Sequence, residues 1–240
     1  MKLNQSLFRM LKLAASGAAF SLLVACGGNA YVEDADRNDV ITVGDSIFDL
    51  SGDIQRFLEE EAGQTFRNYT QSGAEIAGGA IATSVTQQYS DAKSTDANIA
   101  TVVMDGGGND ILIPAILLDP YGCRTHWWRW SISSSCRNLV DDTYVDTVNL
   151  INTMDNDGVE KVIFLGYYEL PRGNANLEGA LTYGAKRLGE ACSNSTANCT
   201  FVDPRGYIPA AHVKWDNIHP TEEGSRTLAD LLWPHLQNAL

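Results

Sequence analysis

Four residues that could act together in nucleophilic catalysis stand far apart in this sequence. Ser46 follows the apolar run 40–43, Asn109 follows three glycines, and Asp216 and His219 lie near the carboxyl terminus. A serine hydroxyl is a weak nucleophile at neutral pH, so it needs a histidine base within hydrogen-bond distance and a carboxylate to orient that base. These residue types therefore indicate acyl transfer, provided that the fold brings them together.

Each of these residues also has a simpler structural interpretation. Asp45 and Ser46 could form only a turn and cap the next helix. Asp216 and His219 could likewise be a local cap at the start of the last helix. The glycines before Asn109 could cradle a phosphate, but no Gly-Lys-Ser/Thr follows them, which excludes a P-loop.

The elements that must position these residues alternate between strands and helices. Apolar or alternating runs predict strands at 40–43, 66–70, 99–104, 160–165 and 200–202. Helices are expected at 76–89, 139–154 and 177–192, and in a last helix that begins at Pro220. The alternation predicts a parallel sheet covered on both faces, with the loops after its strands gathered at one edge.

Two of the expected helices carry an apolar stripe. In 139–154 the stripe would contain Val145, Val148 and Ile151. In the last helix it would contain Leu228, Leu231, Leu232 and Leu236. This second stripe would anchor the last helix on the core and so hold His219 at its amino end.

Four sequence blocks resemble those of the SGNH, or GDSL, esterases and lipases. They are Gly44-Asp45-Ser46, the glycine block at Gly73, Gly107-Gly108-Asn109-Asp110, and Asp216-Asn217-Ile218-His219-Pro220. Ile47 replaces the family's usual leucine, but the blocks occur in the family's order and span 40–240. The resemblance implies a three-layer α/β/α, flavodoxin-like fold with five parallel strands, and it implies no metal or cofactor.

The resemblance also implies a mechanism and a function. Ser46 would attack an ester carbonyl, His219 would carry the proton, and Asp216 would hold the imidazole. The backbone amides of Ser46 and Gly73 and the side-chain amide of Asn109 would bind the oxyanion. We therefore expect a hydrolase that cleaves carboxylic esters through an acyl-enzyme. The alternatives are an O-acyl esterase that acts on polysaccharide and a catalytically silent binding lipoprotein of the cell envelope.

The first 25 residues are expected to be an export signal. A basic leader precedes the uncharged run 13–25, which is too short for a comfortable transmembrane helix. The run ends in Leu23-Val24-Ala25-Cys26-Gly27, which resembles a bacterial lipobox. An ordinary signal peptide is the alternative. We expect lipidation of Cys26, a tether over 26–39 and a domain over 40–240, anchored in the cell envelope and, because glycine follows the cysteine, in the outer membrane.

The remaining four cysteines fall into two local couples. We predict the disulfides Cys123–Cys136 and Cys192–Cys199, which an oxidising envelope would permit, although two other pairings are formally open. A zinc site is the rival interpretation. It is weakly supported because neither couple has Cys-x-x-Cys spacing or a neighbouring histidine.

The segment 112–137, an expected insert near the site, interrupts the alternation of strands and helices. Long irregular segments of compact domains are usually functional, and this one holds Trp127, Trp128 and Trp130. The tryptophans could line an apolar or sugar-binding surface for the substrate, or they could cover the core.

Composition bounds the possible partners. The chain has 240 residues, 44% of them hydrophobic, which fits one folded domain behind the leader. Its net charge is −13, so nucleic acid is excluded as a partner on electrostatic grounds. The expected partners are an ester substrate and, through the lipid anchor, a membrane.

Overall fold

A computed structural model describes residues 34–79, 81–171 and 176–240. Its strands form one parallel five-stranded sheet in the order β2-β1-β3-β4-β5. The bounds are β1 Arg37–Val43, β2 Phe66–Asn68, β3 Thr101–Met104, β4 Lys161–Leu165 and β5 Cys199–Val202. This order is that of the flavodoxin-like fold, so the expected architecture is confirmed.

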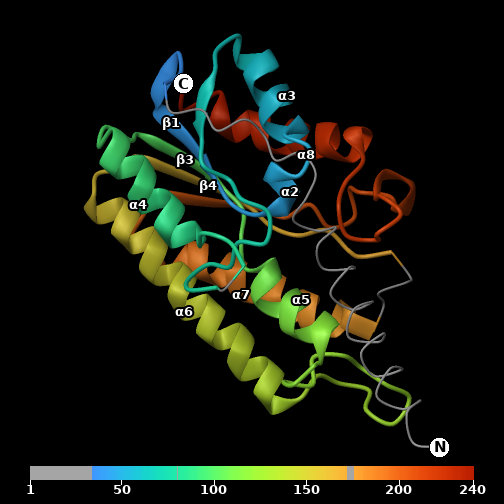
Figure 1. Cartoon of the computed structure of the whole chain (residues 1–240). Coiled ribbons are helices and arrows are strands. Elements are labelled where there is room, and N and C mark those ends of the chain that lie inside the picture. The colour runs from blue at the N-terminus through green and yellow to red at the C-terminus, as the bar shows by residue number, and fades with distance from the viewer. Residues whose placement is uncertain (1–33, 80, 172–175) are drawn as a thin grey trace, which may run out of the picture.

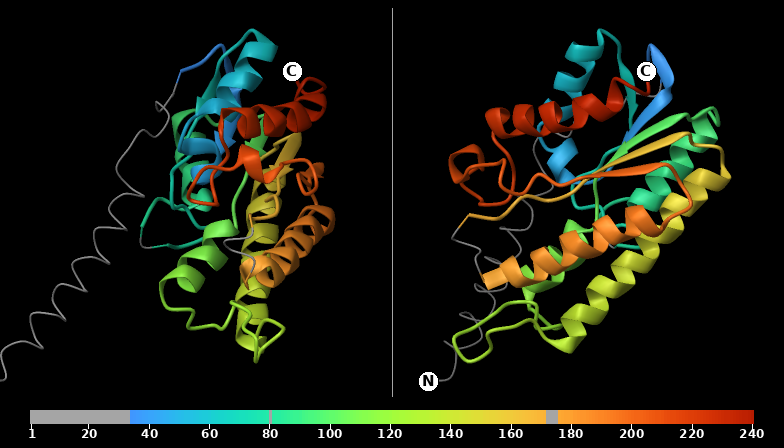
Figure 2. Two further views of the ribbon diagram at one scale, coloured as in Figure 1. Left: turned by 90° about the vertical axis from the view of Figure 1, so that its right-hand side faces the viewer. Right: turned by 180° about the vertical axis from the view of Figure 1, so that it is seen from behind.

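Helices cover both faces of the sheet, as Figures 1 and 2 show. Their bounds are α2 Ser46–Asp49, α3 Asp53–Ala62, α4 Val85–Thr95, α5 Gly108–Leu117, α6 Ser134–Asn156, α7 Glu178–Asn194 and α8 Glu222–Leu236. The helices α3 and α8 lie on one face, and α4, α6 and α7 lie on the other. The helix α5 packs against α6 and α7.

Alternating strand residues feed two separate cores. Ile41 and Val43 of β1 face the core under α4, α6 and α7, whereas Val40 faces the core under α3 and α8. The period of two in a strand produces this division. In α8 the stripe is confirmed, because Leu228, Leu232 and Leu236 are fully buried and Leu231 packs at the margin.

The sheet reverses its winding direction between β1 and β3. These two strands are paired in register, with Val43 beside Met104, so both chains leave the sheet at the same edge. Ligands of doubly wound sheets bind in the crevice outside this edge, at the reversal point. Ser46 begins the short helix after β1, and Asn109 lies in the first turn of the helix after β3.

The helix expected at 76–89 is displaced. The structure begins α4 only at Val85, where the Ser84 side chain caps it by accepting a hydrogen bond from the Gln87 amide. Gly78 and Gly79, in the intervening loop, both have positive φ. The apolar composition of this stretch concealed two residues whose backbone conformation ends a helix.

Other boundaries also differ from the expectations. The exposed Val145 does not belong to the buried stripe of α6, which runs through Val140, Thr147 and Ile151. Thr221, not Pro220, begins α8 as its cap, because Pro220 bridges to Val213 instead.

The limits of the expected tether and insert change as well. The strand β1 starts at Arg37, so residues 37–39 of the expected tether 26–39 already belong to the sheet. The segment 112–137 is irregular only in its middle, because α5 continues to Leu117 and α6 begins at Ser134.

None of the helices in the described ranges is long and apolar enough to span a membrane. The expected export signal 1–25, Cys26 and the first part of the tether lie outside the described residues.

Candidate active site

Ser46 stands at the first position of α2, immediately after β1. Asp45 caps this short helix by accepting a hydrogen bond from the Ile47 amide at 3.0 Å. The cap leaves the Ser46 hydroxyl in a pocket and its backbone amide in the unpaired first turn of the helix. The turn and helix cap that were the alternative to a nucleophile at Ser46 are therefore both present. They also place the Ser46 side chain in the pocket.

The turn before Ser46 is fixed by two buried side chains. The Gln88 side chain accepts from the Gly44 amide at 2.7 Å and donates to the Gly44 carbonyl at 3.0 Å. Asp105 accepts from the Asp45 amide at 2.7 Å. Glycine is required at position 44, because an added Cβ would stand 1.7 Å from Asp105 Oδ1.

Asp105 and Asp45 form a buried acidic pair behind the turn. Burial, followed by the neighbouring charge of Asp45, raises the pKa of Asp105 well above its usual value. Tyr167 donates to the Asp45 carboxylate at 2.6 Å, and burial raises the pKa of this phenol. Both shifts favour the protonated forms, and the protonated Tyr167 hydroxyl is the donor to Asp45. Neither residue had been recognised from the sequence.

His219 and Ser46 are adjacent in the structure although 173 residues separate them. The distance from His219 Nε2 to Ser46 Oγ is 2.8 Å, and the distance from His219 Nδ1 to Asp216 Oδ2 is 2.9 Å. Both His219 and Ser46 are buried. The serine hydroxyl can donate to Nε2 while Nδ1–H donates to the carboxylate, which is the arrangement that a general base requires.

The loop from Asp216 to His219 is held from several sides. Asp216 Oδ1 accepts from the amides of Ile218 and His219, both at 2.9 Å. Burial opposes ionisation of Asp216, but hydrogen bonds from the His219 ring and from these two amides outweigh it and lower its pKa to about 2. The Tyr168 hydroxyl donates to the Ile218 carbonyl. Asp216 thus holds both the backbone of its own turn and the His219 ring by hydrogen bonds.

Gly73 and Asn109 line the same pocket as Ser46 and His219. Gly73 has φ +88°, a conformation that favours glycine and lets its backbone follow the sharp loop after β2. Asn109 lies in the first turn of α5, and its side-chain nitrogen donates to the Ala74 carbonyl at 2.9 Å. The structure thus brings together every residue of the expected triad and oxyanion hole.

We compared the sequence and the structure with known proteins. No protein-family model and no curated protein matches the sequence. Among solved structures, a protein from Slackia heliotrinireducens classed provisionally as an SGNH hydrolase has a TM-score of 0.57 at 16% identity, covering 82% of this chain and 97% of its own.

Two further solved structures are similar. A lipase from a goat-rumen metagenome has a TM-score of 0.60 at 12% identity, covering 83% of this chain and 96% of its own. A carbohydrate esterase of family 3 from Talaromyces cellulolyticus has a TM-score of 0.56 at 16% identity, with the same coverage.

The chain has the SGNH-hydrolase fold. The likeness covers most of the described residues, so the fold implied by the sequence blocks is confirmed. At these identities the comparison concerns the fold, and the chemistry must be argued from the residues themselves.

Two acids that sequence reasoning missed anchor the Gly73 loop of this SGNH fold. Asp49 accepts from the Ser72 amide at 2.7 Å and from the Ser72 hydroxyl at 2.5 Å. Asp110 accepts from the Ile76 amide at 3.1 Å. Asp110 is the last residue of the block Gly107-Gly108-Asn109-Asp110, and Asp49 lies three residues after Ser46. These positions are the signal that could have identified the two acids.

The environment of Asp110 favours its neutral form. Burial raises the pKa of Asp110 to about 7, and the charge of Glu75 acts in the same direction, against the hydrogen bond from Ile76. The Gly73 loop is therefore held by one acid that titrates near neutral pH.

The three tryptophans lie outside the pocket, contrary to one expectation. Trp127, Trp128 and Trp130 are 79%, 63% and 87% exposed, so they do not cover the core either. They belong to the loop between α5 and α6, which leaves the far end of α5 (Figures 1 and 2). None of them lines the pocket that contains Ser46.

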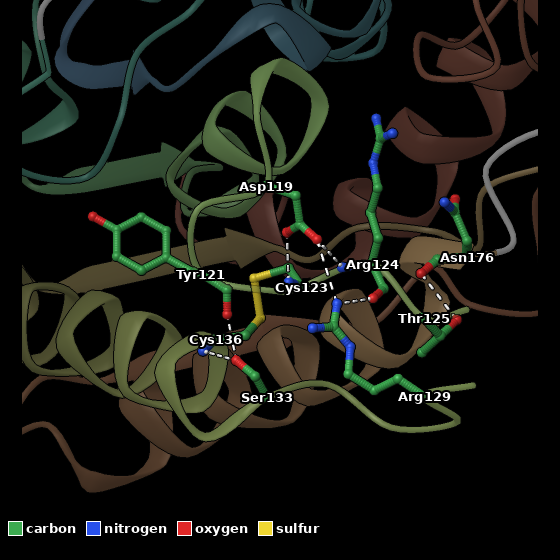
Figure 3. Close-up of polar contacts among 9 residues, drawn as sticks. All are labelled: Asp119, Tyr121, Cys123, Arg124, Thr125, Arg129, Ser133, Cys136 and Asn176. Carbon is green, nitrogen blue, oxygen red and sulfur yellow. Dashed lines mark hydrogen bonds and ion pairs between the residues drawn. A yellow bond between two sulfur atoms is a disulfide. The ribbon is translucent and has the colours of Figure 1, made fainter. Parts of the chain in front are cut away.

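The tryptophan loop has a defined internal structure, shown in Figure 3. The disulfide Cys123–Cys136 ties it to the start of α6, and Asp119 accepts from the Cys123 amide at 2.6 Å. The Arg129 guanidinium donates to the Arg124 carbonyl at 2.5 Å. The other expected disulfide, Cys192–Cys199, is also present.

A second, smaller pocket lies beside the first. It shares Ser46, Asn109, Leu112 and Ile218 with the first pocket, and Tyr167, Tyr168 and Leu181 also line it. Ser46 thus borders both pockets.

Proposed function

We propose that this protein is a serine ester hydrolase. The observation that carries the proposal is the continuous set of hydrogen bonds from Ser46 Oγ through His219 to Asp216, at 2.8 and 2.9 Å. Fold similarity to esterases and lipases supports the same reaction class.

In the first half of the reaction, Ser46 Oγ attacks the ester carbonyl carbon while His219 Nε2 takes its proton. The amides of Ser46 and Gly73 and the side chain of Asn109 donate to the oxyanion. The C–O bond to the alcohol then breaks, and His219 returns the proton to the departing oxygen. Water, activated by the same imidazole, next cleaves the acyl-enzyme and regenerates the Ser46 hydroxyl.

The experiment that tests this proposal is labelling by a fluorophosphonate. Ser46 should form a bond to phosphorus with loss of fluoride, and peptide mapping should locate the adduct on Ser46. Ser51 is a suitable control because it lies five residues away in an exposed turn. Absence of an adduct on Ser46 would favour the silent binding lipoprotein instead.

An O-acetyl esterase acting on polysaccharide is less well supported. That hypothesis was motivated by the three tryptophans and by the expected envelope location, and the tryptophans line neither pocket that contains Ser46. Fold similarity to a carbohydrate esterase is comparable to that to a lipase, so it does not distinguish the two hypotheses.

The cellular location is a separate proposal. We infer from the lipobox-like sequence that Cys26 carries lipid and anchors the domain in the bacterial envelope. Metabolic labelling with a fatty-acid analogue should mark the full-length protein, and Cys26→Ser should abolish the label. Equal labelling of both would contradict the anchor.

A further inference from the structure

The helix α5 has two apolar faces, and only one of them is used for packing. Ile111 and Ala115 are buried in the core shared with α6 and α7, and the buried Leu112 lies between this core face and the Ser46 pocket, which it also lines. Ile113, Ile116 and Leu117 lie on the opposite side of the helix, because successive residues are separated by about 100°. This second set, the outer stripe, lines the Ser46 pocket.

Two residues of the outer stripe are more exposed to solvent than is usual for large aliphatic side chains. Ile116 is 42% exposed and Leu117 is 52% exposed, although both are large aliphatic residues. A helix that is apolar all round is normally buried all round. Contiguous exposed apolar surface commonly marks a binding site, and here it extends from the catalytic pocket.

The rest of the pocket matches this apolar wall. The aliphatic lining is completed by Leu50, Ile81, Leu112 and Ile218. The polar side chains are those of Ser46, Ser72, Asn109 and His219. No Asp, Glu, Lys or Arg side chain lines it within the described part of the chain. A sugar would bring hydroxyl groups that need hydrogen-bond partners along their length, and burying them unpaired is costly.

We propose that the outer stripe binds the apolar chain of the ester, so the preferred substrates are esters with an aliphatic chain of medium length rather than acetylated sugars. This inference rests on the ester hydrolase function proposed above. From Asn109 to Leu117 the helix rises about 12 Å, which matches a medium-length acyl or alkyl chain in extended form.

Two substrate series test the inference and identify which part of the ester lies on the stripe. In one series, p-nitrophenol is constant and the acid runs from acetate to dodecanoate. In the other, acetate is constant and the alcohol runs from ethanol to decanol. In whichever series varies the chain that lies on the stripe, kcat/KM should rise about fourfold for each methylene that becomes buried, equivalent to about 0.8 kcal/mol. It should then level off once the stripe is covered. A flat or falling profile in both series would overturn the inference.

Matched variants connect the profile to the stripe. The double change Ile116→Ser and Leu117→Ser should reduce the gain per methylene at little cost in folding, because both side chains are already about half exposed. Leu118→Ser is the control: Leu118 is 88% exposed at the same helix end and does not line the pocket. An unchanged profile in the double variant would overturn the assignment to α5.

Three other outcomes are distinguishable from success. If Ser46→Ala hydrolyses every ester as fast as the wild type, the proposed function itself fails. If hydrolysis depends on Ser46 but acetate is the best acid and short alcohols are the best alcohols, only this inference fails. Rates are measured both below and above the concentration at which the substrates aggregate, and the inference applies to the rates below it. A preference for long chains that arises only above that concentration would show that the stripe binds lipid surfaces instead, and would overturn the inference.

Discussion

The side-chain amide of Asn109 donates a hydrogen bond to the carbonyl of Ala74 at 2.9 Å. This contact joins the start of α5 to the loop that carries Gly73, so two of the proposed oxyanion donors are held at a fixed separation. Donors that are already in position need no reorganisation when charge develops, which is why such groups contribute strongly to catalysis.

Asn109→Ala should therefore lower kcat by roughly 100- to 1,000-fold. Asn109→Asp should be more damaging, because it also places a negative charge beside the developing oxyanion. Steady-state kinetics on a p-nitrophenyl ester measures both changes. Equal activity of Asn109→Asp and the wild type would show that the side chain does not face the oxyanion.

Asp216→Asn should lower kcat by roughly 1,000- to 10,000-fold, because the neutral amide no longer stabilises the imidazolium or its tautomer. The pKa of Asp216 is about 2, so its ionisation should not limit activity at any pH above about 4. Asp203→Asn is the control, since Asp203 pairs with Arg205 and lines neither pocket. Full activity of Asp216→Asn would remove Asp216 from the mechanism.

Asp110 should make the free energy of unfolding depend on pH. Its pKa rises from 3.8 to about 7 on folding, so its contribution is fully present below about pH 4 and is lost as the pH rises through 7. Asp110→Asn keeps an acceptor for the Ile76 amide without titrating. Urea unfolding between about pH 5 and pH 8 should show a steeper loss of stability in the wild type than in this variant. Parallel curves would contradict the prediction.

Gly44→Ala should destabilise the fold by about 3 kcal/mol or more, because the new Cβ meets the buried carboxyl group of Asp105. Gly63→Ala is the matched control. Gly63 also has positive φ, but its added Cβ has nothing within 4 Å, so the cost should be only about 1–2 kcal/mol. Denaturant unfolding of both variants measures the difference. A smaller loss at Gly44 than at Gly63 would show that the turn can move.

Much of the site could be predicted because its chemistry resides in local sequence blocks. Ser46 and Asn109 each follow an apolar strand, and parallel strands bring such positions to one edge. Asp216 and His219 are close in sequence, and a buried stripe in the helix that follows fixes where they lie. Residue type and strand order suggested these four residues, and the resemblance of the sequence blocks to the SGNH esterases supplied their expected roles.

The supporting residues could not be predicted in the same way. Gln88 contacts Gly44 from a helix that begins nine residues later than expected, and Tyr167 contacts Asp45 across 122 residues. Such contacts depend on tertiary packing, and no local pattern encodes them. The exposure of the tryptophans likewise depends on where the loop after α5 turns, which its disulfide and the Asp119 contacts determine.

The most direct test of the central claim is the hydrolysis of p-nitrophenyl butyrate by Ser46→Ala, compared with the wild type and with Ser51→Ala. The account predicts that kcat falls at least about 10,000-fold in Ser46→Ala and is unchanged in Ser51→Ala. Turnover by a folded Ser46→Ala protein within tenfold of the wild-type rate would contradict it.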